Sequence, residues 1–268
     1  MPVISVAGRA VHTVEVGGGE PLVLLHGLGT NLASMWLSLA RPLSKSHRVL
    51  LYDHRGHGLS EPAESGYDLA TLARDLDELL DHLDPDGPLD MAGYSYGGAV
   101  LLRHLIDRPG RVRRAILLDP PLPPYDPEDD LLALGRAWDV PEAAVAHLLG
   151  PDRAAFSDAA EGLLAALAPG RRSRRSRGVH WSSPAEARFE TTLVEDLEAS
   201  PAFDPDELAS VRVPVLVLSC ADSSFRSEHE ELVEALPDAR LRVLEGDHYA
   251  PLSRPAPFAT AIEAFLDG

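Results

Sequence analysis

The chain has 268 residues, of which 45% are hydrophobic and 25% are charged, a composition typical of a folded protein with a sizeable core. Its formal net charge of −18 argues against nucleic acid and anionic membranes as partners, because their phosphates would be repelled over most of the surface. No apolar run is long enough to span a membrane, and the single cysteine, Cys220, cannot form an internal disulfide, so we expect a soluble, cytoplasmic protein.

Short apolar runs that end at glycines or polar residues predict buried strands. They cover Val11–Val16, Pro21–Leu25, Arg48–Tyr52, Pro88–Ala92, Arg114–Leu118, Pro214–Ser219 and Leu241–Leu244. Helices are expected between them. The clearest follows Asp68, a candidate N-cap, where leucines recur at steps of three and four residues from Leu69 to Leu83. This alternation predicts an α/β protein with a mostly parallel sheet and helices on both faces.

The alternation stops at Pro120 and resumes after Asp206. We interpret residues 120–206 as an inserted helical cap, and residues 1–119 and 207–268 as the core domain. The cap carries an arginine-rich run, Arg171–Arg177. A solvated loop is the first interpretation of this run, and an anion-attracting rim over a substrate entrance is the second.

A Gly-Tyr-Ser-Tyr-Gly motif centred on Ser95 lies between the strand at Pro88–Ala92 and a helical run at Ala99–Ile106. Gly93 and Gly97 remove side chains that would collide in a sharp strand-to-helix turn. A serine exposed on such a turn is a candidate nucleophile.

A serine hydroxyl needs a base to remove its proton, and histidine suits that task at neutral pH. His248 follows the strand at Leu241–Leu244 by a short loop, so we expect it at the same sheet edge as Ser95. A carboxylate must then orient the imidazole. We predict Asp222 in this role, and Asp119, at the end of the preceding strand, is the alternative.

The order Ser, Asp, His and five motifs make the chain resemble the α/β-hydrolase fold superfamily, in its capped, serine-nucleophile branch. The motifs are His26–Gly29, Asp53–Ser60, Gly93–Gly98, Pro214–Asp222 and His248–Pro255. The resemblance implies an eight-stranded sheet and an oxyanion hole formed by the backbone N–H groups of Leu28 and Tyr96. It also implies structural rather than catalytic roles for His54, Arg55 and His57.

The expected function is a cofactor-free serine hydrolase that cleaves an ester, thioester or activated ketone of a small to medium hydrophobic molecule, possibly linked to CoA or a carrier. A lyase or cyclase that uses the same residues on a natural-product-like substrate is the alternative. We expect neither a metal site nor a phosphate-binding glycine loop. Aromatic candidates for the substrate pocket are Trp36, Trp138, Trp181, Phe225 and Tyr249.

Overall fold

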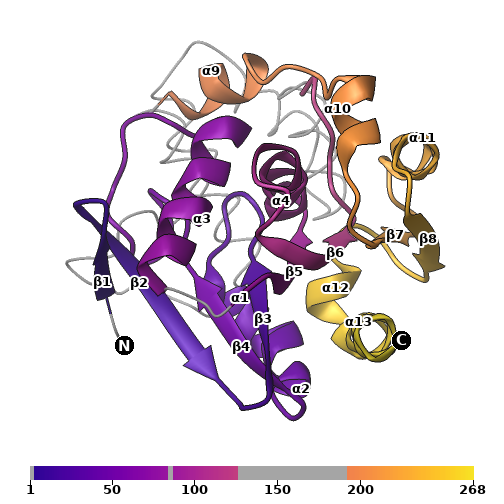
Figure 1. Ribbon diagram of the computed structural model, residues 1–268, viewed down its shortest axis with the longest axis horizontal. Coiled ribbons are helices and arrows are strands. Elements are labelled where there is room, and N and C mark those ends of the chain that lie inside the picture. Colours follow the sequence, from indigo (N-terminus) through magenta and orange to yellow (C-terminus); the bar gives the residue numbers. More distant parts are fainter. Residues whose placement is uncertain (1–2, 84–86, 126–191) are drawn as a thin grey trace, which may run out of the picture.

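The computed structural model describes residues 3–83, 87–125 and 192–268. Within these residues, eight strands form one sheet in the order β1-β2-β4-β3-β5-β6-β7-β8 (Figure 1). The strands are β1 (Val3–Val6), β2 (Arg9–Val16), β3 (Glu20–Leu25), β4 (His47–Tyr52), β5 (Leu89–Tyr94), β6 (Val112–Leu118), β7 (Val215–Cys220) and β8 (Ala239–Leu244).

The sheet is mostly parallel, as predicted. Only β1 with β2 and β2 with β4 pair in antiparallel fashion, and every pairing from β4 through β3 to β8 is parallel. Each of the seven predicted strands is present, with bounds that differ by at most two residues at either end. Strand β1 has no counterpart among the strands predicted from the sequence.

Helices cover both faces of the sheet, and Figure 1 shows α3 and α4 on one side of the strands and α12 and α13 on the other. The first face carries α3 (Leu69–Leu83), α4 (Tyr96–Asp107), α9 (Leu193–Glu198), α10 (Pro205–Ser210) and α11 (Arg226–Ala235). The second face carries α1 (Leu32–Met35), a π-helical turn η1 (Trp36–Ala40), α2 (Arg41–Leu43), α12 (Ala250–Ser253) and α13 (Pro255–Asp267).

Each face has its own apolar core, and strand β3 shows how one strand serves both. Val23 and Leu25 join the cluster under α3 and α4, whereas Leu22 and Leu24 join the cluster under α13. Successive side chains of a strand point to opposite faces, so a strand that is covered on both sides must be apolar at every position. This is why the central strands are continuous apolar runs in the sequence.

Helix α3 follows the predicted pattern. The Asp68 carboxylate accepts a hydrogen bond from the Thr71 N–H at 2.9 Å, which confirms the N-cap. Five of the six leucines that define the repeat are buried, and only Leu83, at the last residue, is exposed. Burial of each such leucine contributes roughly 2 kcal/mol.

The strand order reverses direction beside β3. The chain proceeds from β3 to β4 on one side and to β5 and β6 on the other. Ligands of open parallel sheets bind at the carboxyl ends of the strands at such a switch point. Ser95 follows β5, Asp119 follows β6 and His248 lies beyond the end of β8.

Most of the predicted cap, residues 126–191, lies outside the described residues, together with the arginine-rich run. The predicted boundary between residues 206 and 207 falls inside α10, which contacts α4 and α11 of the core. Among the helices that the structure describes, none combines the length and the apolar character that a membrane crossing requires.

Candidate functional site

Ser95 occupies a strained turn between β5 and α4, with φ 53° and ψ −130°. Left-handed backbone of this kind costs about 1–3 kcal/mol in a non-glycine residue and persists where its surroundings enforce it. A Cβ at Gly93 would lie 2.3 Å from the carbonyl oxygen of Gly97, and a Cβ at Gly97 would lie 2.4 Å from the carbonyl oxygen of His26. The turn therefore requires both glycines, as the sequence analysis expected.

The structure brings Ser95, His248 and Asp119 together in one hydrogen-bonded chain. Ser95 Oγ lies 2.8 Å from His248 Nε2, and His248 Nδ1 lies 2.7 Å from Asp119 Oδ2. Because a carboxylate only accepts, Nδ1 carries the proton and Nε2 is free to accept from the serine. The Tyr94 hydroxyl donates to the His248 carbonyl at 3.0 Å, and the two rings stack with centroids 5.4 Å apart.

Asp119, and not Asp222, contacts His248, so the preference of the sequence analysis for Asp222 is wrong and its alternative matches the geometry. Asp119 is fully buried and has φ 49°, which turns its side chain back over the sheet edge. Asp222 is exposed, and its N–H donates to the Gly246 carbonyl at 3.0 Å. The turn after β7 thus directs the next residue, Ser223, toward the site, where its hydroxyl donates to Asp119 Oδ2 at 2.8 Å.

The surroundings of Asp119 favour its ionised form. Burial raises the pKa of this carboxyl and is the largest single influence. The hydrogen bond and charge of His248, the N–H of Cys220 at 2.7 Å and the nearby His229 together outweigh burial and lower the pKa below its usual value. A charged carboxylate is therefore available to hold the imidazole.

The two residues expected to form an oxyanion hole belong to segments that lie next to Ser95. A Cβ at Gly27, the neighbour of Leu28, would lie 3.0 Å from Ser95 Cβ and 3.4 Å from its hydroxyl oxygen, so this loop passes directly over the serine. Tyr96 is the first residue of α4, whose N-terminus presents backbone N–H groups and a partial positive charge. Its side chain points away, into the core, where the hydroxyl donates to the Tyr67 carbonyl at 2.6 Å.

Of the aromatic pocket candidates, Phe225 and Tyr249 lie against the triad. Each ring meets His248 edge to face with centroids 5.5 Å apart. Trp36 packs against the apolar cluster on the α13 face. Trp138 and Trp181 lie outside the described residues.

Three buried histidines, His26, His54 and His57, connect the loop after β3 to the turn after β4 by hydrogen bonds. The His54 N–H donates to His26 Nε2 at 3.0 Å, and the Gly29 N–H donates to His57 Nε2 at 3.2 Å. These ring nitrogens accept only when they are unprotonated. Burial lowers the pKa of all three histidines, and that of His54 falls to about 3. This agrees with the structural role that the resemblance implied for His54 and His57.

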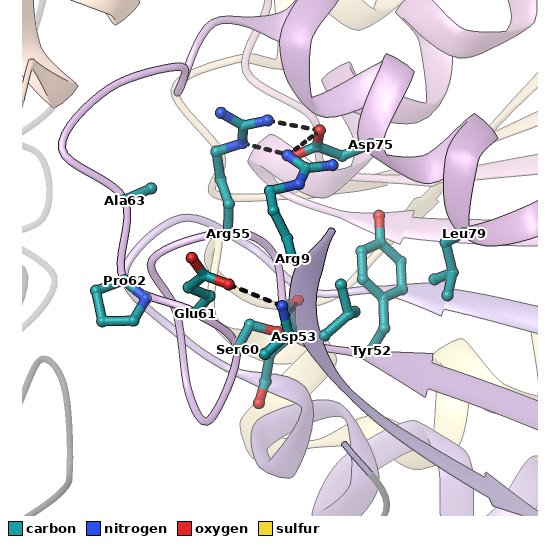
Figure 2. Close-up of a pocket in the computed structure, with 12 residues that line it drawn as sticks. Arg9, Tyr52, Asp53, Arg55, Ser60, Glu61, Pro62, Ala63, Asp75 and Leu79 are labelled. Atoms are coloured by element: carbon teal, nitrogen blue, oxygen red, sulfur yellow. Dashed lines mark hydrogen bonds and ion pairs between the residues drawn. The ribbon is translucent and has the colours of Figure 1, made fainter. Parts of the chain in front are cut away.

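A small cavity of about 40 Å³ lies elsewhere, between β2, β4 and α3, and no triad residue lines it (Figure 2). Asp75 forms ion pairs with Arg9 and Arg55 at its rim. The Tyr52 hydroxyl points toward the side where Asp75 lies, is buried, and has no hydrogen-bond partner among the described residues. The cavity is too small for a substrate, since it has room for only a few water molecules.

Nothing in the described part of the chain groups three or more histidine, cysteine, aspartate or glutamate side chains in a way that could hold a metal ion. Cys220 is buried beside Asp119, and burial raises the pKa of its thiol, so the thiolate is disfavoured.

Comparison with known proteins agrees with the fold. Residues 22–261 match the model of a family described as the alpha/beta hydrolase family. The chain is similar to the putative carbamate hydrolase RutD of Pseudomonas savastanoi, with 30% identity over 96% of this chain and 97% of that protein. It is also 30% identical to a segment of the polyketide synthase ThaQ of Burkholderia thailandensis, over 97% of this chain but only 12% of the synthase. Among solved structures, a hydrolase from Pseudomonas aeruginosa matches with a TM-score of 0.74 and 26% identity, over 100% of this chain and 98% of that one.

Proposed function

This chain belongs to the alpha/beta hydrolase family and is a hydrolase, and from that premise we propose that it is a serine hydrolase whose acyl-enzyme intermediate forms on Ser95. The observation that carries the proposal is the continuous chain from Ser95 Oγ through His248 to Asp119, with distances of 2.8 Å and 2.7 Å. A nucleophile, a base and a carboxylate that orients the base are the groups that acyl transfer through serine requires.

In the first half of the reaction, Ser95 Oγ attacks the carbonyl carbon of the substrate while His248 Nε2 takes the hydroxyl proton. The imidazolium that forms is stabilised by Asp119, which remains ionised. His248 then gives its proton to the leaving group as the carbonyl re-forms. In the second half, a water molecule loses a proton to His248, attacks the acyl group and releases Ser95.

The negative charge that develops on the substrate oxygen is stabilised by the N–H groups of Leu28 and Tyr96. Support comes from the close approach of Gly27 to Ser95 and from the position of Tyr96 at the start of α4. Removal of one such donor typically costs about a hundred- to a thousandfold in kcat. These donors are therefore as important to the rate as the base.

The test is labelling with a fluorophosphonate probe together with turnover of p-nitrophenyl esters. We expect stoichiometric labelling of Ser95 in the wild-type protein and none in Ser95→Ala. Asp119→Asn should lower kcat about a thousand- to ten-thousandfold, because the wrong tautomer of His248 is then favoured. Asp222→Asn is the matched control and should stay near wild-type activity, and the reverse ranking would refute the assignment of Asp119.

We propose an ester, a thioester or an activated ketone as the substrate, and the similarity to a segment of a polyketide synthase favours a carrier-bound or CoA-linked thioester among these. A panel of p-nitrophenyl esters and acyl-CoAs of increasing acyl length separates the classes. Higher kcat/KM for acyl-CoAs than for esters of equal length supports the thioester, and the opposite order refutes it.

Hydrolysis is distinguished from lyase or cyclase chemistry by turnover in ¹⁸O-labelled water. Release of an acyl-enzyme by water puts one labelled oxygen into the acid product. A product without label, formed by a protein that still requires His248, would refute hydrolysis and favour the alternative.

The proposed location is the cytoplasm. The single cysteine supports it, because a chain without internal disulfides is typical of a reducing compartment. Cell fractionation with an antibody against the chain tests the proposal, and recovery outside the cytoplasmic fraction would refute it.

A further inference from the structure

The turn between β7 and α11 contacts two members of the triad at once. The Ser223 hydroxyl donates to Asp119 Oδ2 at 2.8 Å, the same oxygen that His248 Nδ1 reaches at 2.7 Å. Two residues later, the Phe225 ring packs edge to face on His248. The segment that contains Asp222, the acid predicted from the sequence, thus supplies a hydrogen-bond donor to Asp119, the acid that contacts His248.

The orientation of the Ser223 hydroxyl is determined by its neighbours. Asp119 is a carboxylate and can only accept, so Ser223 directs its single proton at Asp119. The Ser223 oxygen in turn accepts the Phe225 N–H at 3.2 Å, and the Ser223 N–H donates to the Cys220 carbonyl at 3.1 Å. With these contacts made, the hydroxyl is held in one position.

Within the described ranges, four titratable groups face Asp119 from the elements packed around it. They are His248 beyond β8, His229 on α11, Cys220 on β7 and Tyr94 on β5. His229 Nδ1 is 3.9 Å from Asp119 Oδ1, but burial lowers the pKa of His229, and its ring nitrogens contact the Ser219 hydroxyl and the Pro120 carbonyl, both at 2.9 Å. Burial raises the pKa values of Cys220 and Tyr94, so both are neutral.

Among the described residues, Asp119 therefore has no permanent cation beside it, and hydrogen bonds must hold its charge. The Cys220 N–H donates to Asp119 Oδ1, and the Ser223 hydroxyl donates to Asp119 Oδ2. Hydrogen bonds to an ionised group are about twice as strong as neutral ones. The backbone donor cannot be lost by substitution, whereas the serine hydroxyl can.

We propose that Ser223 is a positioning residue of the reaction: its hydroxyl holds Asp119 ionised and aligned with His248 while the imidazole gains the serine proton. This inference rests on the serine-hydrolase proposal. The Ser223 proton stays on Ser223 throughout, so no bond to it forms or breaks.

The experiment compares Ser223→Ala, Ser223→Thr and Ser224→Ala, where Ser224 is the exposed neighbour and the matched control. The readouts are kcat and KM for p-nitrophenyl butyrate, the pH profile of kcat/KM, the labelling rate of Ser95 by a fluorophosphonate, and the thermal unfolding midpoint. For Ser223→Ala we expect kcat to fall about ten- to a hundredfold with KM nearly unchanged.

Without the Ser223 donor, Asp119 Oδ2 is a stronger acceptor for the Nδ1–H of His248 and stabilises the imidazolium more, so the acid limb of the pH profile should move to higher pH. Ser223→Thr keeps the hydroxyl and should restore both kcat and the profile, and Ser224→Ala should match the wild type. If Ser223→Ala lowers only the unfolding midpoint, with kcat and the acid limb unchanged, Ser223 merely stabilises the turn and the inference is overturned.

Failure of this inference is separable from failure of the proposed function. A wild-type protein that the fluorophosphonate does not label at Ser95 overturns the serine-hydrolase proposal and the role of Ser223 with it. A wild-type protein that is labelled, with Ser223→Ala labelled equally fast, overturns the role of Ser223 alone.

Discussion

Acidification from pH 7 to pH 5 is expected to destabilise this protein before its carboxylates titrate, because five buried histidines are held neutral in the folded state. They are His26, His54, His57, His104 and His229, and burial is the main cause of the lowered pKa in each case. The hydrogen bonds agree, since His26 and His57 each accept a backbone N–H at a ring nitrogen that protonation would block.

The pKa of His54 gives the magnitude of this loss of stability. Its pKa is about 3 in the folded protein, against about 6.5 in an unfolded chain. Between these values the unfolded chain binds a proton that the folded chain excludes, so the free energy of unfolding falls by about 1.4 kcal/mol for each pH unit below 6.5. At pH 5 the loss from His54 alone is about 2 kcal/mol, and the other four histidines add losses of the same sign. Asp119 contributes in a lower window, because its stabilisation is lost only as the pH falls below the usual range of aspartate.

Urea unfolding at pH 7, 6 and 5 measures the effect. His54→Gln keeps a donor toward the His26 carbonyl, which His54 Nε2 reaches at 3.1 Å, and should remove about 2 kcal/mol of the pH dependence. The same change at the exposed His82 is the control and should leave it intact. A free energy of unfolding that is equal at pH 7 and pH 5 would refute the neutral, buried histidine network.

Two pairs of substitutions probe the packing around the site and the cavity. Gly97→Ala should destabilise the protein by about 1–3 kcal/mol and abolish fluorophosphonate labelling, because the added Cβ would overlap the His26 carbonyl. Gly110→Ala is the control, and since the space around its Cβ is open, it should change neither the stability nor the labelling. Tyr52→Phe should raise the free energy of unfolding by about 1 kcal/mol, because it removes a buried hydroxyl that has no hydrogen-bond partner in the described part of the chain. Tyr94→Phe should lower it by about as much, because it breaks the bond to the His248 carbonyl. A loss of stability in Tyr52→Phe would contradict this account of the cavity.

The sheet and helix α3 were predictable because their signals are local. A strand covered on both faces must be apolar throughout, and an amphipathic helix must repeat every three to four residues. Strand β1 lacks such a signal: it has four residues, it contains Ser5, and Val3 is 50% exposed. Strand β1 forms because it pairs with β2, and the four residues of β1 carry no local pattern that predicts this pairing.

Ser95 and His248 were predictable for a different reason. Both follow parallel strands, and the carboxyl ends of parallel strands meet at one edge. The acid was harder to assign, because Asp119 and Asp222 both lie at that edge. The choice depends on the φ of one residue and on a tight turn after β7, and neither property has a sequence signature in a non-glycine residue.

Backbone strain and sheet pairing together explain why the site holds its geometry. Among the described non-glycine residues, positive φ occurs only at Ala7, Ser95 and Asp119. The N–H of Ser95 donates to the Leu118 carbonyl of β6, and the N–H of Asp119 donates to the Leu218 carbonyl of β7, each at 2.8 Å. These bonds extend the parallel ladders one step into the turns, so each strained residue is held by the strand beside it. Since adjacent strands lie about 4.8 Å apart, the sheet itself sets the separation of nucleophile and acid, and His248 bridges it.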